Sequence, residues 1–199
     1  MIIYVETNFL MGIAKGQDTL AQELLQNTPS FLRLVVPSIC FVESLTTLEQ
    51  EEKYNLDFLR NLDIQINQAE RDNSDNAQTL LSYLEQSRTS FLQRANEVKK
   101  RFDVAFNQLV SKSEMITLNT GIFQVTLNRA IFEKHIIDKI ILECIIFHAG
   151  LHHNENKLFL SNNSKEFGKR EVTEILRNVG IQYFNKTQSF LGWLQSQTN

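Results

Sequence analysis

Three carboxylates occur at positions where the surrounding sequence is apolar: Glu6, Glu43 and Asp138. Glu6 ends the apolar run 2–5, and Asp138 lies among isoleucines. Glu43 lies in the first turns of a helix that we expect to begin after Pro37. Burying an unpaired carboxylate costs several kcal/mol, so each of these acids is expected to have a partner.

The partner of each acid is either a Lys or Arg in a structural salt bridge or, if the acids come together, a shared cation. Several carboxylates in one place repel one another unless a divalent ion neutralises them. Oxygen ligands without a His or Cys cluster favour Mg²⁺ or Mn²⁺. His135, His148, His152 and His153 lack zinc-finger spacing, and the last two are interpreted as a solvated helix end.

The elements that must position these acids are short apolar strands separated by helices. Strands are predicted at 2–5, 34–36, 158–160 and 181–184, where short β-branched or aromatic runs are bounded by polar residues. Strands joined by helices pair in parallel, which predicts a layered α/β fold. In such sheets, binding sites form beyond the carboxyl ends of the strands, where Glu6 and the segment 161–167 lie.

Helices are predicted between and after these strands from apolar periodicity and from capping residues. Thr7 or Asn8 is expected to cap the first helix, Ser38 the helix that carries Glu43, and Asn119 or Thr120 a later one. The other helices are expected at about 17–26, 120–132, 135–150, 171–178 and 187–195.

A long helical hairpin is predicted in the middle of the chain. Apolar residues recur at helical intervals over 45–66 and 75–110, in the second stretch with an alternating spacing of three and four. The turn between the two helices is expected at about 69–74. The hairpin is interpreted as an interaction surface or as a bulky insertion.

Composition limits the class of protein but not its function. The 199 residues carry a net charge of −3, which does not indicate a dedicated nucleic-acid binder, so such a partner would need a local basic patch. The most apolar stretch, 136–149, is too short and too charged to cross a membrane. No secretory signal is visible and Cys40 and Cys144 read as reduced, packed thiols, so we expect a cytoplasmic protein.

Four segments in order resemble the PIN-domain nucleases: YVETNFL, VPSICFVES, IIDKIILECIIFHA and LFLSNNSKEF. The PIN pattern is a strand ending in Asp-Thr-Asn, a Glu on an early helix, an Asp opening a later helix, and a polar segment after the next strand. The resemblance implies a three-layer α/β fold with a short, mainly parallel sheet flanked by helices. The whole chain, 1–199, would be one PIN-like domain with a helical insertion at about 56–114.

The resemblance implies a metal-dependent phosphodiesterase that hydrolyses RNA. Glu6, Glu43 and Asp138 would be the catalytic acids and would hold Mg²⁺ or Mn²⁺, which activates the attacking water. Residues expected to orient these groups or the substrate are Thr7, Asn8, Ser161, Asn162 and Asn163. Phosphate contacts are expected from Lys165, Lys169 and Arg170.

Two features depart from the PIN pattern. Glu6 replaces the usual Asp and places its carboxylate one methylene further from the backbone. The fourth segment offers Asn162 and Asn163, with Glu166 either a late acid or part of a solvated helix start. Fewer charges at this position imply weaker metal binding.

Three functions therefore remain open from the sequence. The first is a PIN-like ribonuclease, in particular the toxin of a toxin–antitoxin pair, with a cognate antitoxin and a homodimer as expected partners. The second is a catalytically inactive relative that binds RNA or a protein. The third is a helical scaffold whose acids form salt bridges, and it requires that Glu6, Glu43 and Asp138 do not share one pocket.

Overall fold

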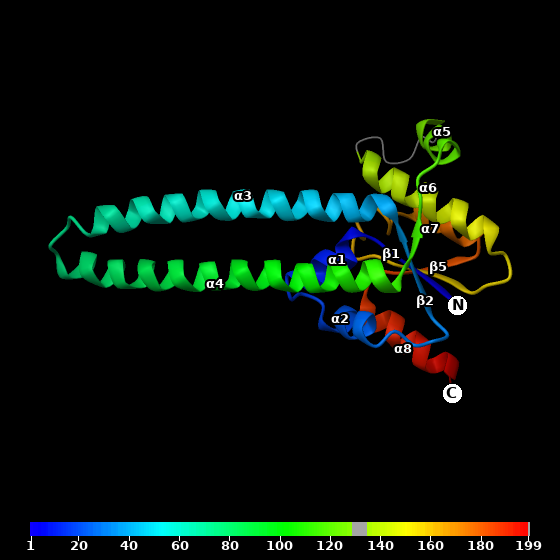
Figure 1. Ribbon diagram of the computed structural model, residues 1–199, viewed down its shortest axis with the longest axis horizontal. Coiled ribbons are helices and arrows are strands. Elements are labelled where there is room, and N and C mark those ends of the chain that lie inside the picture. The colour runs from blue at the N-terminus through cyan, green and yellow to red at the C-terminus, as the bar shows by residue number, and fades with distance from the viewer. Residues whose placement is uncertain (129–134, 199) are drawn as a thin grey trace.

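The computed structural model describes residues 1–128 and 135–198, in which five strands form one sheet (Figure 1). The strands are β1 (Ile2–Val5), β2 (Arg33–Pro37), β3 (Glu114–Ile116), β4 (Lys157–Leu160) and β5 (Ile181–Phe184). All neighbouring strands pair in parallel, in the order β3-β2-β1-β4-β5. The sequence did not predict β3, because three residues of which one is buried carry no strand pattern.

The helices of the described ranges account for most of the chain. They are α1 (Thr7–Ala14), α2 (Thr19–Gln26), α3 (Ser38–Ala69), α4 (Asp75–Lys112), α5 (Thr120–Asn128), α6 (Ile136–Leu151), α7 (Arg170–Asn178) and α8 (Thr187–Thr198). The predicted extension of α5 to about residue 132 lies outside the described residues. None of these helices is long and apolar enough to cross a bilayer.

The sheet is covered by helices on both faces (Figure 1). Helices α1, α2 and α4 contact one another on one face, and α8 contacts α2 and β5. Helix α6 crosses β2 and β3 on the other face, where α7 packs beside β5. This arrangement confirms the predicted three-layer α/β fold with a parallel sheet.

The order in which strands are added to the sheet reverses between β1 and β4. The connection after β1 leads to β2 on one side, whereas the connection after β4 leads to β5 on the other. Open α/β sheets bind ligands in the crevice at such a switch point, beyond the carboxyl ends of the strands. Val5 pairs with Leu160, so the residues that follow, Glu6 and Ser161, emerge side by side in this crevice.

Two helix starts differ from the prediction. Glu6, rather than Thr7 or Asn8, caps α1, since its Oε2 accepts a hydrogen bond of 2.8 Å from the Asn8 N–H. The N-cap residue of α3 is Pro37 rather than Ser38, and this helix start has no side-chain cap hydrogen bond. Asn119 does cap α5, since its Oδ1 accepts from the Ile122 N–H at 3.0 Å.

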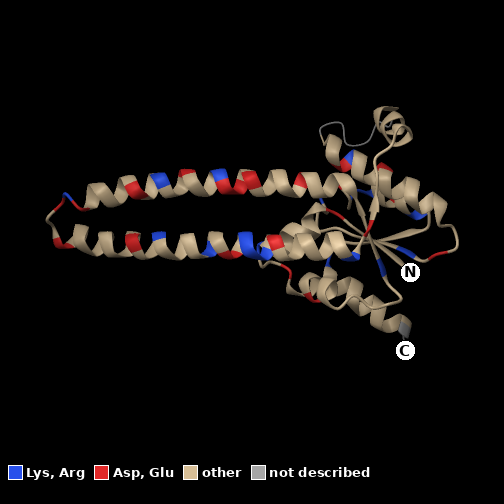
Figure 2. Cartoon of the chain, viewed as in Figure 1, with Lys and Arg blue, Asp and Glu red and all other residues tan. Residues whose placement is uncertain are grey.

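Helices α3 and α4 pair in antiparallel fashion and extend as a hairpin well beyond the sheet (Figure 1). The inner part of α4 joins the main core through buried Phe102 and Leu109. The outer part is only two helices thick, and its buried apolar residues are Leu62, Ala69 and Ala77. Charged residues are distributed along both helices of the hairpin (Figure 2).

Candidate active site

A cleft of about 180 Å³ opens at the carboxyl edge of the sheet, where β1 and β4 end. Residues from α1, α3, α6 and the segment after β4 line this cleft: Glu6, Thr7, Asn8, Met11, Lys15, Glu43, Thr47, Asp138 and Asn163. The three predicted acids thus share one pocket with three of the predicted orienting residues.

Glu6 lies at the bottom of the cleft and is 3% exposed. Both of its carboxylate oxygens accept hydrogen bonds of 2.8 Å, Oε1 from the Ser161 hydroxyl and Oε2 from the Asn8 N–H. Burial raises the pKa of Glu6 to about 7 against the effect of these two bonds. The negative charges of Glu43 and Asp138 raise the pKa of Glu6 further.

Glu43 lies in the second turn of α3 and is half-buried. The Thr7 hydroxyl donates a short hydrogen bond to its Oε2, which links the start of α1 to α3. Burial raises the pKa of Glu43, and the bond from Thr7 opposes this rise. Thr7 therefore holds a carboxylate that costs free energy to ionise in the absence of a cation.

Asp138 lies in the first turn of α6, and Nδ2 of Asn163 donates to its Oδ1 at 3.3 Å. Burial raises the pKa of Asp138 to about 6, and the charges of Glu43 and Glu166 add to the rise. Within the described ranges, no Lys or Arg forms a salt bridge to Glu6, Glu43 or Asp138. Among the described residues, salt bridges to Lys or Arg therefore do not account for the three acids, and all three line one pocket, which the scaffold hypothesis did not expect.

A family model of the PIN domain matches residues 3–167 of the sequence. The chain belongs to the PIN-domain family. PIN domains are generally nucleases that act on nucleic acids and usually use divalent metals. A comparison with curated proteins found no match.

In this PIN domain, the sequence reasoning missed three residues of the cleft: Met11, Lys15 and Thr47. Met11 and Lys15 follow Thr7 at intervals of four, and Thr47 follows Glu43 at the same interval. Residues spaced by four lie on one face of a helix, so this spacing could have revealed all three. Lys15 brings a positive charge into the cleft, where its Nζ lies 2.7 Å from Oε1 of Glu51.

The segment after β4 forms the rim of the cleft. Glu166 is half-buried. Its Oε1 lies 3.6 Å from Nε2 of His135, and its Oε2 lies 2.5 Å from Nζ of Lys169. The charge of Glu166 raises the pKa of Asp138, but the Glu166 side chain does not line the cleft. Asn162 and Lys165 are exposed outside the lining. Arg170 is also exposed and pairs with Glu174 at 2.8 Å.

A different group in the described part of the chain has the closest arrangement of metal-ligating atoms. Ligand atoms of Glu114, His148 and His152 all lie within 4.8 Å of one another, whereas the acids of the cleft are more widely spread. This group is at the amino edge of the sheet, where Nε of Arg33 forms an ion pair with Oε2 of Glu114 at 3.3 Å. His148 bonds to Glu114 and to the Tyr4 hydroxyl, both at 2.9 Å. Existing hydrogen bonds and ion pairs thus account for this group, including His152, which was predicted to be a solvated helix end.

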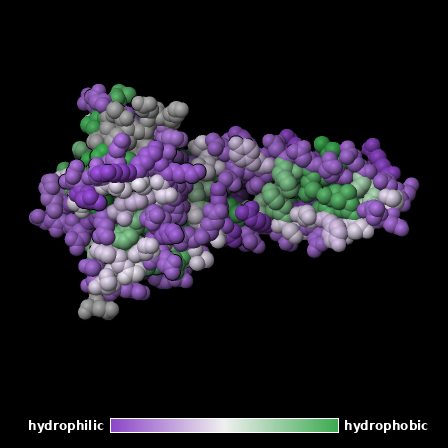
Figure 3. Space-filling model, turned by 180° about the vertical axis from the view of Figure 1, so that it is seen from behind, coloured by the Kyte–Doolittle hydropathy of each residue, from purple (hydrophilic) through white to green (hydrophobic). Residues whose placement is uncertain are grey.

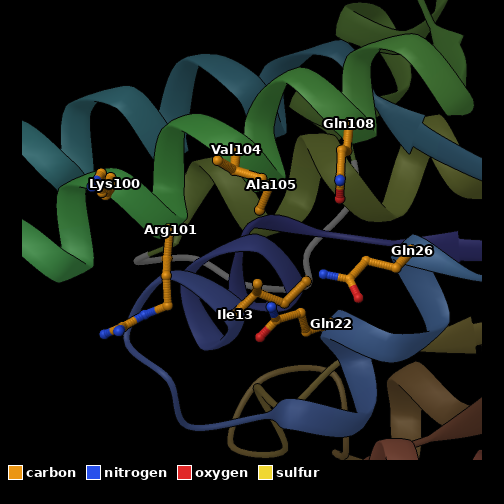
Figure 4. Close-up of a pocket in the computed structure, with 8 residues that line it drawn as sticks. All are labelled: Ile13, Gln22, Gln26, Lys100, Arg101, Val104, Ala105 and Gln108. Atoms are coloured by element: carbon orange, nitrogen blue, oxygen red, sulfur yellow. The ribbon is translucent and has the colours of Figure 1, made fainter.

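A second cavity, of about 240 Å³, lies between α1, α2 and α4 and shares no residue with the acidic cleft (Figure 4). Its lining contains glutamines, apolar residues and two cations but no carboxylate: Ile13, Gln22, Gln26, Lys100, Arg101, Val104, Ala105 and Gln108. Nε of Arg101 donates a hydrogen bond of 2.9 Å to the carbonyl oxygen of Ala14. The described lining of this cavity therefore offers no carboxylate, the protein ligand that Mg²⁺ usually requires.

Proposed function

We propose that this PIN domain is a metal-dependent ribonuclease whose active site is the acidic cleft. One observation carries the proposal: Glu6, Glu43 and Asp138, from three distant parts of the sequence, line one cleft with Asn163 at the switch point of the sheet. RNA as the substrate is inferred from the family resemblance.

The donor set of the cleft suits a hard divalent cation. Three carboxylates and the Asn163 side chain supply oxygen atoms, and the described lining of the cleft contains no His or Cys. Burial raises the pKa values of all three acids, and neighbouring carboxylates raise those of Glu6 and Asp138 further, so a cation would stabilise their ionised forms. In our proposal Glu6, Glu43 and Asp138 would hold Mg²⁺ or Mn²⁺, which would supply Lewis-acid activation of water and of the phosphate.

The neighbouring residues fix the orientation of the three acids. Ser161 and the Asn8 N–H hold the two oxygens of Glu6, and Thr7 holds one oxygen of Glu43. Asn163 holds Oδ1 of Asp138. Each acid keeps further lone pairs for a cation, because a carboxylate oxygen can accept more than one bond. The group is therefore preorganised by contacts among α1, α3, α6 and the segment after β4.

Substrate phosphates are expected to contact Lys15 within the cleft and Lys165 on its rim. Lys15 can exchange Glu51 for a phosphate oxygen, since this surface ion pair contributes little to stability. Lys169 and Arg170 already pair with Glu166 and Glu174, so we propose the same exchange for them. Such contacts provide affinity that does not depend on sequence.

A second candidate function is that of an inactive PIN-like protein that binds RNA or a protein partner. It is favoured by the two hydrogen bonds of Glu6, which satisfy both of its oxygens without a metal. Glu6 also replaces the Asp of the PIN pattern. This candidate predicts binding without cleavage.

The finer proposal, that the protein is the toxin of a toxin–antitoxin pair, rests on the family resemblance alone. It predicts that expression of the wild-type chain arrests growth and that expression of Asp138→Asn does not. A cognate antitoxin would then cover the acidic cleft. Normal growth on expression of an active wild-type nuclease would contradict this role.

The test of the ribonuclease is cleavage of labelled single-stranded RNA in Mn²⁺, compared with the same reaction in EDTA. We expect Asp138→Asn to lower cleavage at least 100-fold with an unchanged circular dichroism spectrum. Asp57→Asn, an exposed aspartate of α3, is the matched control and should cleave like the wild type. Equal cleavage by both variants would reject the proposed site, and RNA binding without cleavage by the wild type would favour the inactive candidate.

A further inference from the structure

The outer part of the hairpin has two different flanks. Phe58 packs against Phe91 on one flank, with ring centroids 4.5 Å apart. Asp63 pairs with Arg88 at 2.7 Å on the other, in a groove that Glu85 also lines. Helical spacing assigns the remaining surface residues to one flank or the other.

The flank that contains Phe58 carries no charge over most of the outer hairpin. Intervals of three and four from Phe58 lead to Asn61 and Gln65 on α3. On α4, those from Phe91 lead back to Ser87 and forward to the exposed Arg94, which bounds the uncharged stretch on the side of the sheet. The same flank carries Leu80 near the tip of the hairpin. We call this surface the uncharged flank, and its residues are Phe58, Asn61 and Gln65 on α3 and Leu80, Ser87 and Phe91 on α4.

Large apolar side chains are exposed on and beside the uncharged flank. Phe58 is 48% exposed, Leu80 51%, Tyr83 64%, and Tyr54, one turn before Phe58, 71%. Figure 3 shows this side of the molecule, with apolar surface gathered over the outer half of the hairpin. Contiguous apolar surface of this kind marks an interaction site in soluble proteins.

We propose that the uncharged flank binds the same flank of a second copy of this chain, so that two hairpins form a four-helix bundle. A two-helix hairpin is half of such a bundle, and heptad-like spacing along α3 and α4 is the pattern that bundles use. Two identical uncharged surfaces meet without opposing like charges, as a two-fold symmetric interface requires. RNA is the less suitable occupant, because its phosphates call for Lys and Arg.

The exposed area is sufficient for a dimer. If each large side chain offers roughly 200 Å², the exposed parts of Tyr54, Phe58, Leu80 and Tyr83 amount to about 450 Å² per copy. The surface that two copies can bury exceeds the roughly 1,000 Å² expected of a specific interface. This surface includes the polar residues between the large side chains, namely Asn61, Gln65 and Ser87. The dimer does not depend on the nuclease proposal, since the flank lies outside the acidic cleft.

Two exposed leucines on opposite flanks provide a matched pair for the test. Leu80 lies on the uncharged flank, and Leu56, 57% exposed, lies seven residues before Asp63 on the charged one. By light scattering and sedimentation between 1 and about 100 μM, the wild type should have twice the mass of one 23.1 kDa chain. Leu80→Glu should weaken dimerisation at least 100-fold, and Leu56→Glu less than threefold.

Ser87→Arg places like charges in the interface at an exposed helical position and serves as a second variant, which should also be monomeric. Circular dichroism should show unchanged helix content in all three variants. A monomeric wild type at 100 μM, or equal effects of Leu80→Glu and Leu56→Glu, would overturn the proposal. Loss of RNA binding in Leu80→Glu with an unchanged oligomeric state would assign the flank to RNA instead and would also overturn it.

Discussion

At the scale of single residues, the main feature is Glu6, a buried carboxylate to which no Lys or Arg of the described ranges forms a salt bridge. Glu6 caps α1, accepts a hydrogen bond from Ser161 and lies buried at the cleft. Its raised pKa means that the folded protein binds a proton more tightly than the unfolded chain. Without metal, the Glu6 carboxylate therefore destabilises the fold as it ionises.

The stability of the metal-free protein should show this ionisation. In EDTA, the Glu6 contribution to the free energy of unfolding should fall as pH rises from about 4.5 to about 7, by up to about 3 kcal/mol. Urea denaturation gives the free energies of unfolding of the wild type and of Glu6→Gln at each pH in this range. The difference between the two free energies is the contribution of Glu6. A difference that stays constant with pH would show that Glu6 does not titrate in this window.

Lys15 is the cation among the described residues that line the cleft, and its role can be tested separately from that of the acids. Lys15→Ala should lower kcat/KM for RNA about tenfold and reduce the salt dependence of binding by about one phosphate contact. Lys53→Ala, an exposed lysine of α3 paired with Glu49, is the control and should change neither quantity. Similar effects of the two variants would show that Lys15 acts only through the general charge of the surface.

At the scale of elements, the two parts of the hairpin should contribute very differently to stability. Leu109 is 2% exposed within the main core, whereas Leu62 is 9% exposed between only two helices. Leu109→Ala should therefore cost about 2–5 kcal/mol, and Leu62→Ala less than about 2 kcal/mol, in urea denaturation. Equal costs would mean that the outer hairpin is as tightly packed as the body.

At the scale of the whole molecule, a cleft in the body and an interaction surface on the outer hairpin should be separable. Replacing residues 57–93 by a short Gly-Ser turn removes the uncharged flank but keeps the ion pair of Glu52 and Lys99. The shortened protein should be a monomer that cleaves RNA within threefold of the wild-type rate. A folded but inactive monomer would show that cleavage depends on the hairpin or on the dimer.

Sequence patterns with a short period predicted much of this protein. The strands predicted at 2–5 and 158–160 and the helix predicted at 75–110 are confirmed. The structure adds that these two strands are neighbours in the sheet. Strand β3 was missed because three residues have no period. The caps at Thr7 and Ser38 were wrong because Glu6 and Pro37, one position earlier, start these helices.

The sequence by itself determined which residues stand at the strand ends and helix starts, because local spacing and side-chain shape fix these elements. It therefore placed Glu6, Glu43 and Asp138 in the right elements. Only the tertiary structure decided that Ser161 holds Glu6 across 155 positions and that Lys15 enters the same cleft. It also decided that α3 and α4 pair so that charges gather on one flank of the hairpin and are absent from most of the other. Such relations depend on which faces pack together, and that choice is made by the burial of the whole core rather than by any local pattern.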